Sequence, residues 1–275
     1  GVQTCALPIF QEFKPGVEIA CTGIFGPAGW MDYWFEGFEH KKQMNDDLGV
    51  NTGEMGTVIR CTKSSKIADM MMKPLADTLH EIGYVGMLDV NCIVDEKDGT
   101  PWPMEWTARP GYPMWNIMQP LIKGDPAEWM LDCIKGKNTL ECIEETSVGV
   151  VMACSDFPFN KKDPEDYLDF PILTDDVSEE EMDNVHPCEI KLSQTVKMID
   201  GKLVEEHPEW GTAGTYILVC TGTGKTITEA KDKAYKLLKK VKLGNDPQWR
   251  TDIGNRCESA LKKLQKFGFC KGWKF

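Results

Sequence analysis

The sequence predicts an α+β fold, and three observations carry this prediction. Two segments of alternating polar and apolar residues, 88–91 and 104–109, flank a turn-rich stretch and are typical of a β-hairpin. Apolar residues recur at helical spacing over residues 66–82. An apolar run at 148–153 is typical of a buried strand. Strands and helices are therefore both expected to contribute to the core.

The expected hairpin has two chemically different faces. Side chains alternate between the faces of a strand, so Asp89 and Asn91 should share one face with Glu105, Thr107 and Arg109. This face offers hard oxygen donors and a guanidinium, which suit a magnesium–nucleotide complex. A half-exposed sheet with polar residues facing water would show the same alternation, so the hairpin alone leaves both interpretations open. The opposite, apolar face is expected to carry Leu88, Val90, Cys92, Met104 and Trp106.

Two elements are expected before the hairpin. Residues 10–25 should form two short strands around a Pro-Gly turn at 15–16. The helix over 66–82 should end at Gly83, because glycine readily adopts the left-handed conformation that follows a helix. The core-facing residues of this helix are expected to be Ile67, Met70, Met71, Leu75 and Leu79.

The elements after the hairpin are mixed. Residues 114–135 are expected to be helical, with Pro120 and Pro126 as breaks or first-turn residues. The acidic, proline-punctuated segment 160–187 is expected to be an exposed excursion. Further strands are expected near 188–200 and 215–220, and further helices over 228–241 and 255–267.

Composition excludes several classes of protein. A net charge of −12 argues against a general nucleic-acid-binding surface, and no apolar run is long enough to span a bilayer. The eleven cysteines include no C-x-x-C pair, and the four histidines form no ligand cluster, so neither a zinc site nor a disulfide framework is expected. Reduced, mostly buried thiols fit a cytoplasmic protein.

The chain is expected to divide into three parts. Residues 1–9 look like the translation of a sequencing adapter, and we expect them to be an artefact that hides a missing natural start. A shift in composition near 140–148 marks the expected boundary between a domain over 10–145 and a second over 146–275.

Two sequence features are weak evidence for a phosphate site. The segment 221–226, Thr-Gly-Thr-Gly-Lys-Thr, invites a phosphate-binding loop, but the motif needs a glycine where Val219 stands. A strand, tight turn and helix would explain these glycines structurally. His40 lies beside two lysines and could touch phosphate, yet a lone histidine is more often structural.

Four segments, in this order, resemble motifs of one enzyme family. Residues 12–18 resemble its E-F-x-x-G-x-E segment, and 39–42 its acidic-His-Lys-basic segment. Residues 51–56 resemble its N-T-G-G-M-G loop, and 105–113 its E-F-N-x-R-F-G-D-P segment. The stretch 215–256 is also similar to the last domain of that family. The family is that of the phosphoribosylamine–glycine ligases, within the ATP-grasp ligases.

The resemblance implies a fold and a reaction. The expected fold is the C-terminal half of an ATP-grasp fold over 10–145, followed by a small α/β C-terminal domain over 146–275. The implied reaction is ATP-dependent ligation of glycine to 5-phosphoribosylamine through a glycyl phosphate, a step of de novo purine synthesis. The chain would need an N-terminal part of its own that is absent here, so this fragment alone should be inactive.

The resemblance also implies roles for nucleotide and metal ligands. Glu12 and Glu18 would lie near the adenosine, and His40 and Lys41 would also bind the nucleotide. Arg109 would contact phosphate or the acyl-phosphate transition state as the catalytic residue. The ligands of Mg²⁺ or Mn²⁺ would be Glu105, Asp89 and Thr107.

The acceptor pocket would be formed by Asn51, Thr52, Gly53, Glu54 and Gly56. Three departures from the motifs concern the substrates. Thr107 replaces an asparagine metal ligand, Glu54 replaces a glycine, and Tyr112 replaces an aspartate. Two alternatives therefore stay open: a divergent ATP-grasp ligase with a different amine or amino-acid substrate, or a non-catalytic nucleotide-binding module.

Overall fold

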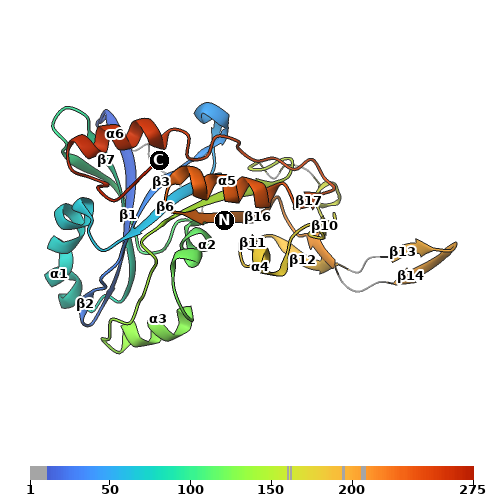
Figure 1. Ribbon diagram of the computed structural model, residues 1–275, viewed down its shortest axis with the longest axis horizontal. Coiled ribbons are helices and arrows are strands. Elements are labelled where there is room, and N and C mark those ends of the chain that lie inside the picture. Colours follow the sequence, from blue (N-terminus) through green and yellow to red (C-terminus); the bar gives the residue numbers. More distant parts are fainter. Residues whose placement is uncertain (1–10, 160, 162, 194–195, 206–208) are drawn as a thin grey trace, which may run out of the picture.

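A computed structural model describes residues 11–159, 161, 163–193, 196–205 and 209–275. Its centre is an antiparallel sheet of nine strands in the order β11-β16-β9-β6-β3-β1-β7-β8, with β2 paired to β1 (Figure 1). The strands of this sheet are β1 (Gly16–Gly26), β2 (Gly29–Trp30), β3 (Trp34–Glu39), β6 (Gly56–Thr62), β7 (Gly86–Asp95), β8 (Pro101–Thr107), β9 (Thr146–Ala153), β11 (Val185–Pro187) and β16 (Tyr216–Gly224).

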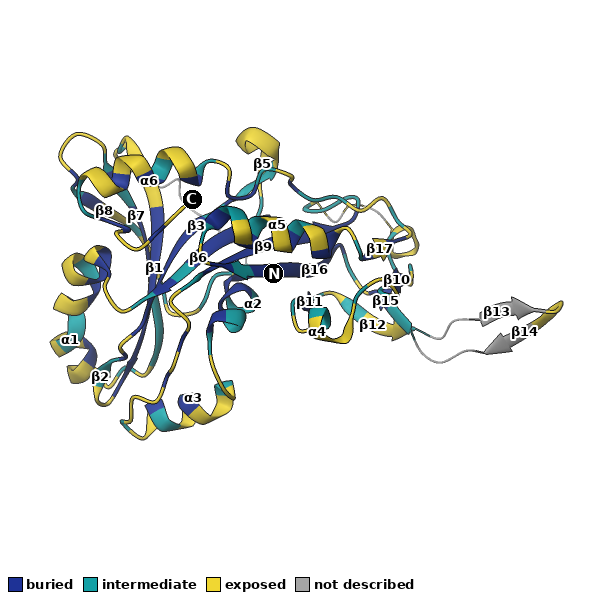
Figure 2. Cartoon of the chain, in the orientation of Figure 1, coloured by how far each residue is buried: buried dark blue, intermediate teal, exposed yellow. Residues whose placement is uncertain are grey.

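Helices cover both faces of the sheet, because alternate residues of its central strands are apolar on both sides. Val58 of β6 belongs to the core beneath α5 (Ile227–Leu238) and α6 (Cys257–Lys266). Its neighbour Ile59 belongs to the opposite core, beneath α2 (Met114–Met118) and α3 (Pro126–Ile134). The strands in the middle of Figure 2 are accordingly buried, whereas the outer faces of the helices are exposed.

Shorter elements surround this sheet. Four two-stranded pairs are β4 (Lys42–Met44) with β5 (Leu48–Asn51), β10 (Ile172–Leu173) with β17 (Lys242–Leu243), β12 (Ile190–Ser193) with β15 (Glu209–Thr212), and β13 (Val196–Ile199) with β14 (Lys202–Glu205). The remaining helices are α1 (Ala76–Glu81), α4 (Glu179–Met182), the π-helical turn Ala68–Met72 and the 3₁₀ turns Asn45–Asp47, Lys73–Leu75, Gln119–Leu121 and Pro164–Asp166.

The predicted hairpin is confirmed. Strands β7 and β8 pair antiparallel, with Asp89 opposite Thr107 and Asn91 opposite Glu105. The expected polar residues therefore share one face. The other face is less buried than its apolar character suggests, because β8 is the edge strand and leaves Trp106 41% exposed.

The predicted helix over 66–82 is interrupted. A π-helical turn precedes a 3₁₀ turn that contains Pro74, and the α-helical part is α1 alone. The π turn rotates the buried face, so Met70 is 47% exposed and Met72 is buried instead, which corrects the predicted core face. Gly83 ends the helix as predicted, with a φ of +66°.

Most other predicted elements are confirmed, and two are corrected. The two strands predicted over 10–25 are a single strand that begins only at Gly16, and residue 10 lies outside the described residues. The acidic excursion contains β10, α4 and β11, although most of its residues are not buried. Helices α2, α3, α5 and α6 and strand β9 lie where they were predicted, and Pro126 opens α3. Part of the predicted strand region 188–200, residues 194–195, lies outside the described residues.

The main sheet crosses the expected domain boundary. Strand β6 from the first part pairs with β9 from the second over five residue pairs, Gly56 to Arg60 against Val150 to Thr146. The division near residue 145 therefore stays a prediction. Among the described residues, no helix combines the length and the apolar character that a bilayer crossing requires.

The close contact between β16 and α5 predicts a specific stability effect. A Cβ atom at Gly222 would lie 2.5 Å from the backbone of Ala230 and Ala234 in α5. Gly222→Ala should therefore lower the free energy of unfolding by roughly 1–3 kcal/mol, measured by urea denaturation. Gly37→Ala is the matched control in β3, because its Cβ would meet nothing nearer than 3.6 Å. Equal stability of the two variants would contradict the inferred packing.

Candidate active site

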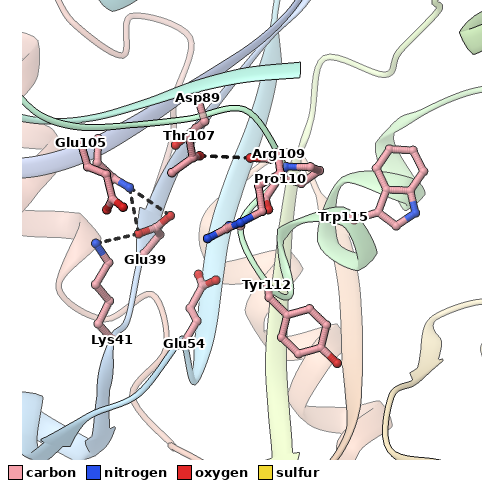
Figure 3. Close-up of a pocket in the computed structure, with 13 residues that line it drawn as sticks. Glu39, Lys41, Glu54, Asp89, Glu105, Thr107, Arg109, Pro110, Tyr112 and Trp115 are labelled. Atoms are coloured by element: carbon pink, nitrogen blue, oxygen red, sulfur yellow. Dashed lines mark hydrogen bonds and ion pairs between the residues drawn. The ribbon is translucent and has the colours of Figure 1, made fainter. Parts of the chain in front are cut away.

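A cavity of about 410 Å³ opens on the polar face of the hairpin. Its walls come from β3 and the residues directly after it, β7, β8, the loop before β6, the segment between β8 and α2, and α2 itself (Figure 3). The lining residues are Glu39, Lys41, Gly53, Glu54, Asp89, Asn91, Glu105, Thr107, Arg109, Pro110, Gly111, Tyr112 and Trp115.

Strand register brings the polar side chains of this cavity together. Because Asp89 faces Thr107 and Asn91 faces Glu105 across the ladder, all four project from the same side of the sheet. The buried Asp89 accepts a hydrogen bond of 2.6 Å from the Thr22 hydroxyl on β1. The carboxylates of Glu39, Glu54 and Glu105 are gathered in one space in Figure 3.

The cavity is rich in negative charge. Four carboxyl groups line it, against the two cationic side chains Lys41 and Arg109. Lys41 is already paired, with its ammonium 2.9 Å from Glu18 and 3.1 Å from Glu39. Burial opposes the charge of Lys41, but these two carboxylates outweigh it and raise the pKa of the ammonium. Lys41 therefore stays charged and leaves the remaining carboxyl groups largely uncompensated.

Burial and mutual repulsion shift the acidic groups of the cavity. Burial, with Glu39 and Glu105 adding to it, raises the pKa of Asp89 to about 7. Glu54 is only 2% exposed, and burial together with Glu39 raises the pKa of its carboxyl well above the usual range. Its Oε1 has no hydrogen-bond partner among the described residues. A bound cation would relieve both effects.

The donor set fits a hard divalent cation. Asp89 and Glu105 supply carboxylate oxygens, and Thr107 and Asn91 supply neutral oxygens on the same face. The Oδ1 atom of Asn91 is buried without a hydrogen-bond partner, which leaves it free to act as a ligand. No group of three or more His, Cys, Asp or Glu side chains suited to a metal occurs in the described part of the chain, so two carboxylates and neutral oxygens would have to hold the ion.

The structure brings together seven of the residues predicted for the site. These residues are Lys41, Gly53, Glu54, Asp89, Glu105, Thr107 and Arg109. The Thr107 hydroxyl donates to the Arg109 carbonyl at 3.1 Å, and the Arg109 guanidinium donates to the Pro110 carbonyl at 3.0 Å. The register confirms that Asp89, Glu105 and Thr107 share one face of the hairpin, whereas the membership and roles of all seven residues in an active site stay predictions.

The other predicted residues lie outside the lining of this cavity. Glu18 is nearby and reaches it only through Lys41. Glu12 points to solvent, with its side chain 77% exposed, and pairs with Lys14 at 2.7 Å. Asn51 and Thr52 end the β4–β5 excursion, and Gly56 begins β6.

His40 is buried behind the cavity. Its Nε2 accepts a hydrogen bond of 3.1 Å from the backbone N–H of Gly254. This placement favours the structural interpretation of His40 over direct contact with phosphate.

Six lining residues were not among the predicted site residues: Glu39, Asn91, Pro110, Gly111, Tyr112 and Trp115. Three of them, Pro110, Gly111 and Tyr112, stand in the motif segment 105–113. Asn91 was assigned to the polar face of the hairpin, and its alternation with Asp89 was the signal that could have included it. Glu39 stands in the same segment as Lys41, two residues before it, so strand periodicity places both on one side. Trp115 follows a helix pattern and carries no signal that distinguishes it from a core residue.

The segment that carries Glu39 and Lys41 is anchored by residues near the end of the chain. The buried Arg250 forms ion pairs of 2.7 Å with Asp252 and 2.8 Å with Asp47. Arg256 donates to the Glu39 carbonyl. Arg250 also donates to the Lys42 carbonyl at 3.1 Å, so the two arginines fix the backbone on both sides of His40 and Lys41.

The buried His40 predicts a pH dependence of stability. Burial, with Arg256 and Arg250 nearby, lowers the pKa of His40 from 6.5 to about 3. Protonation therefore favours the unfolded chain, and the contribution is complete above pH 6.5 and lost as the pH falls toward 3. Relative to His40→Gln, the wild-type free energy of unfolding should fall by about 2 kcal/mol between pH 7 and pH 5. Denaturant titrations at both pH values test this. If the difference in free energy of unfolding between the wild type and His40→Gln is the same at both pH values, the prediction is wrong. His186 does not affect this comparison, because it is present in both proteins.

Comparisons with known proteins agree with this arrangement. No family model matches the chain. The chain is 25% identical over 264 residues to a phosphoribosylamine–glycine ligase from Ralstonia nicotianae, covering 90% of this chain and 56% of the relative. It is 27% identical over 228 residues to the Escherichia coli O157:H7 protein of the same name, covering 79% of this chain and 49% of the relative. The chain thus spans about half the length of the curated relatives it matches.

A solved structure shows the same fold. The phosphoribosylamine–glycine ligase from Thermotoga maritima aligns with a TM-score of 0.62 and 23% identity, over 88% of this chain and 57% of that chain. The order of the sequence motifs, the antiparallel sheet and the cavity on its polar face agree with this likeness. The chain has the ATP-grasp fold and is related to the phosphoribosylamine–glycine ligases.

Proposed function

We propose that this chain carries part of an ATP-dependent ligase that joins glycine to 5-phosphoribosylamine through a glycyl phosphate, in de novo purine synthesis. The observation that carries the proposal is the convergence of Asp89, Asn91, Glu105 and Thr107 on one cavity. The names of the relatives support the choice of reaction. In this reaction ATP phosphorylates the glycine carboxylate, and the amine then displaces phosphate, giving the amide, ADP and phosphate.

The chain's own residues would bind and orient rather than react. No protein nucleophile is required, because the activated carboxylate is attacked directly by the amine. Asp89 and Glu105, with Thr107 and Asn91, would hold Mg²⁺ or Mn²⁺, which neutralises phosphate charge when bound. Arg109 would bind the transferred phosphoryl group, because its guanidinium lines the same cavity and is permanently charged.

The remaining residues divide between the nucleotide and the substrates. Lys41 would bind phosphate and is held in place by Glu18 and Glu39. His40 would act through the backbone that it anchors, beside Lys41. Gly53 and Glu54 line the cavity from the loop before β6 and would form one wall of the substrate pocket.

The complete activity is proposed for a longer polypeptide. The curated relatives are about twice the length of the part they share with this chain, so half of each has no counterpart among these 275 residues. We propose that a segment equivalent to that half completes the site, and that residues 10–145 and 146–275 correspond to the ATP-grasp and C-terminal domains. A cytoplasmic location is proposed with the pathway.

The metal role of Glu105 is testable directly. In a full-length protein that includes these residues, Glu105→Ala should lower glycine-dependent ADP formation by roughly 100-fold or more, because charge on the phosphates is no longer neutralised. A coupled assay for ADP measures this. Glu96→Gln is the matched control, since Glu96 lies in the hairpin turn and pairs with Lys263 outside the cavity. Substantial turnover by Glu105→Ala would remove Glu105 from the metal role.

The 275-residue chain by itself should be a poor catalyst. If half of the ATP site comes from an equivalent of the unmatched segment, the isolated chain should show little ADP formation with glycine and 5-phosphoribosylamine. The same ADP assay, run with the chain alone and with the full-length protein, measures the difference. Full activity of the chain alone would show that these residues already form a complete active site.

A further inference from the structure

One acidic side chain of the cavity destabilises the fold because it is buried without a described hydrogen bond. Glu54 is 2% exposed, and its Oε1 makes no hydrogen bond to any described residue. Arg109, the unpaired cation of the lining, donates to the Pro110 carbonyl and forms no ion pair with Glu54 among the described residues. An unpartnered buried carboxyl group destabilises a fold, so a ligand is the natural explanation for its presence.

The surroundings of Glu54 suit an organic cation. Glu39 and Glu54 both approach Gly111, where an added Cβ would lie 3.6 Å from Glu39 Oε1 and 3.8 Å from Glu54 Oε2. Tyr112 and Trp115 line the same cavity. Figure 3 shows the Glu54 carboxylate between Glu39 and the Tyr112 ring. Carboxylates beside aromatic faces attract ammonium groups, through charge-assisted hydrogen bonds and cation–π contacts.

A second unpartnered polar atom belongs to Tyr216, whose ring packs against that of Tyr112. The Tyr216 hydroxyl is buried without a hydrogen-bond partner among the described residues. The Tyr216 ring lies 4.9 Å from the Tyr112 ring and 5.5 Å from Phe157, so it extends the aromatic wall behind the cavity. This end of the cavity therefore combines negative charge, the aromatic side chains Tyr112 and Trp115, and the unsatisfied Glu54 Oε1.

We propose that Glu54 and Glu39, with Tyr112 and Trp115, form a subsite for the ammonium group of the amino-acid substrate. The proposal rests on the proposed function for the identity of that substrate. It separates two cationic positions in the cavity: a divalent ion beside Asp89 and Glu105, and an ammonium group beside Glu54. Glu54 becomes a specificity residue at a position where the motif that the loop resembles has glycine.

A second divalent ion explains the Glu54 end less well. The described residues offer no group of three acidic, His or Cys side chains for a metal. Aromatic rings supply no ligands for a hard cation, whereas they stabilise an ammonium group. The charge of the cavity also favours a cationic ligand, because Lys41 is already neutralised by Glu18 and Glu39.

The test uses a probe that carries the ammonium group and cannot be phosphorylated. Glycinamide, titrated into the 275-residue chain without nucleotide and followed by ligand-detected NMR, should bind saturably, whereas acetamide should not. Glu54→Gln keeps the size of the side chain and removes its charge, and it should weaken glycinamide binding by about tenfold or more. Glu54→Gly, which restores the motif residue, should do the same.

Glu96→Gln is the matched control and should change glycinamide affinity by less than about threefold, because Glu96 pairs with Lys263 outside the cavity. Glu54→Gln should be at least as stable to heat as the wild type, because it removes a buried charge and breaks no described hydrogen bond. Equal binding by wild type and Glu54→Gln, or equal losses in Glu54→Gln and Glu96→Gln, would overturn the subsite. Failure of the ADP assay would leave this result standing, because the titration involves neither ATP nor metal.

Discussion

The register of β7 against β8 is the constraint on which the site depends. Pairing of Asp89 with Thr107 and of Asn91 with Glu105 puts four oxygen donors on one side of the sheet. A slip of one residue would turn each strand's polar set to the other face, against α6 and the apolar core. The register is held because the alternate residues Val90 and Cys92 are fully buried there. The packing of the apolar face of the hairpin thus fixes the positions of the oxygen donors on its polar face.

Burial also raises the free energy of ionising the carboxyl groups of the cavity. Four carboxyl groups lie close together with one cation already paired, so Asp89 and Glu54 hold protons more tightly than free carboxyl groups do. A fold under selection for stability alone would neutralise or replace them. The arrangement is understandable if cationic ligands supply the missing charge. The excess of carboxyl groups over cationic side chains therefore supports both proposed ligands, the divalent ion beside Glu105 and the ammonium group beside Glu54.

Local patterns predicted the hairpin, most helices and the buried strands β9 and β16, because periodicity and turn residues act over short distances, whereas β3 and β6 in the middle of the sheet were not predicted. The resemblance to known motifs predicted seven of the cavity's residues. The features that were not predicted depend on contacts between segments far apart in the sequence or on irregular helix geometry. The π-helical turn that exchanges Met70 for Met72 has no signal in apolar spacing, since it inserts a residue into the helical repeat. The burial of His40 follows from Gly254, Arg250 and Arg256, more than two hundred residues away in sequence, and no local pattern encodes that contact.

That distant contact also changes how the two expected domains are understood. Glu39 and Lys41 belong to the first by sequence, yet their backbone is fixed by Arg250, Asp252 and Arg256 from the second. Asn45 exchanges two further hydrogen bonds with Thr251, at 2.7 and 2.9 Å. Since β6 and β9 join the same parts within one sheet, the cavity depends on both. The C-terminal part is therefore a structural support of the site, and a change in its Arg250–Arg256 segment would alter the cavity without touching any ligand.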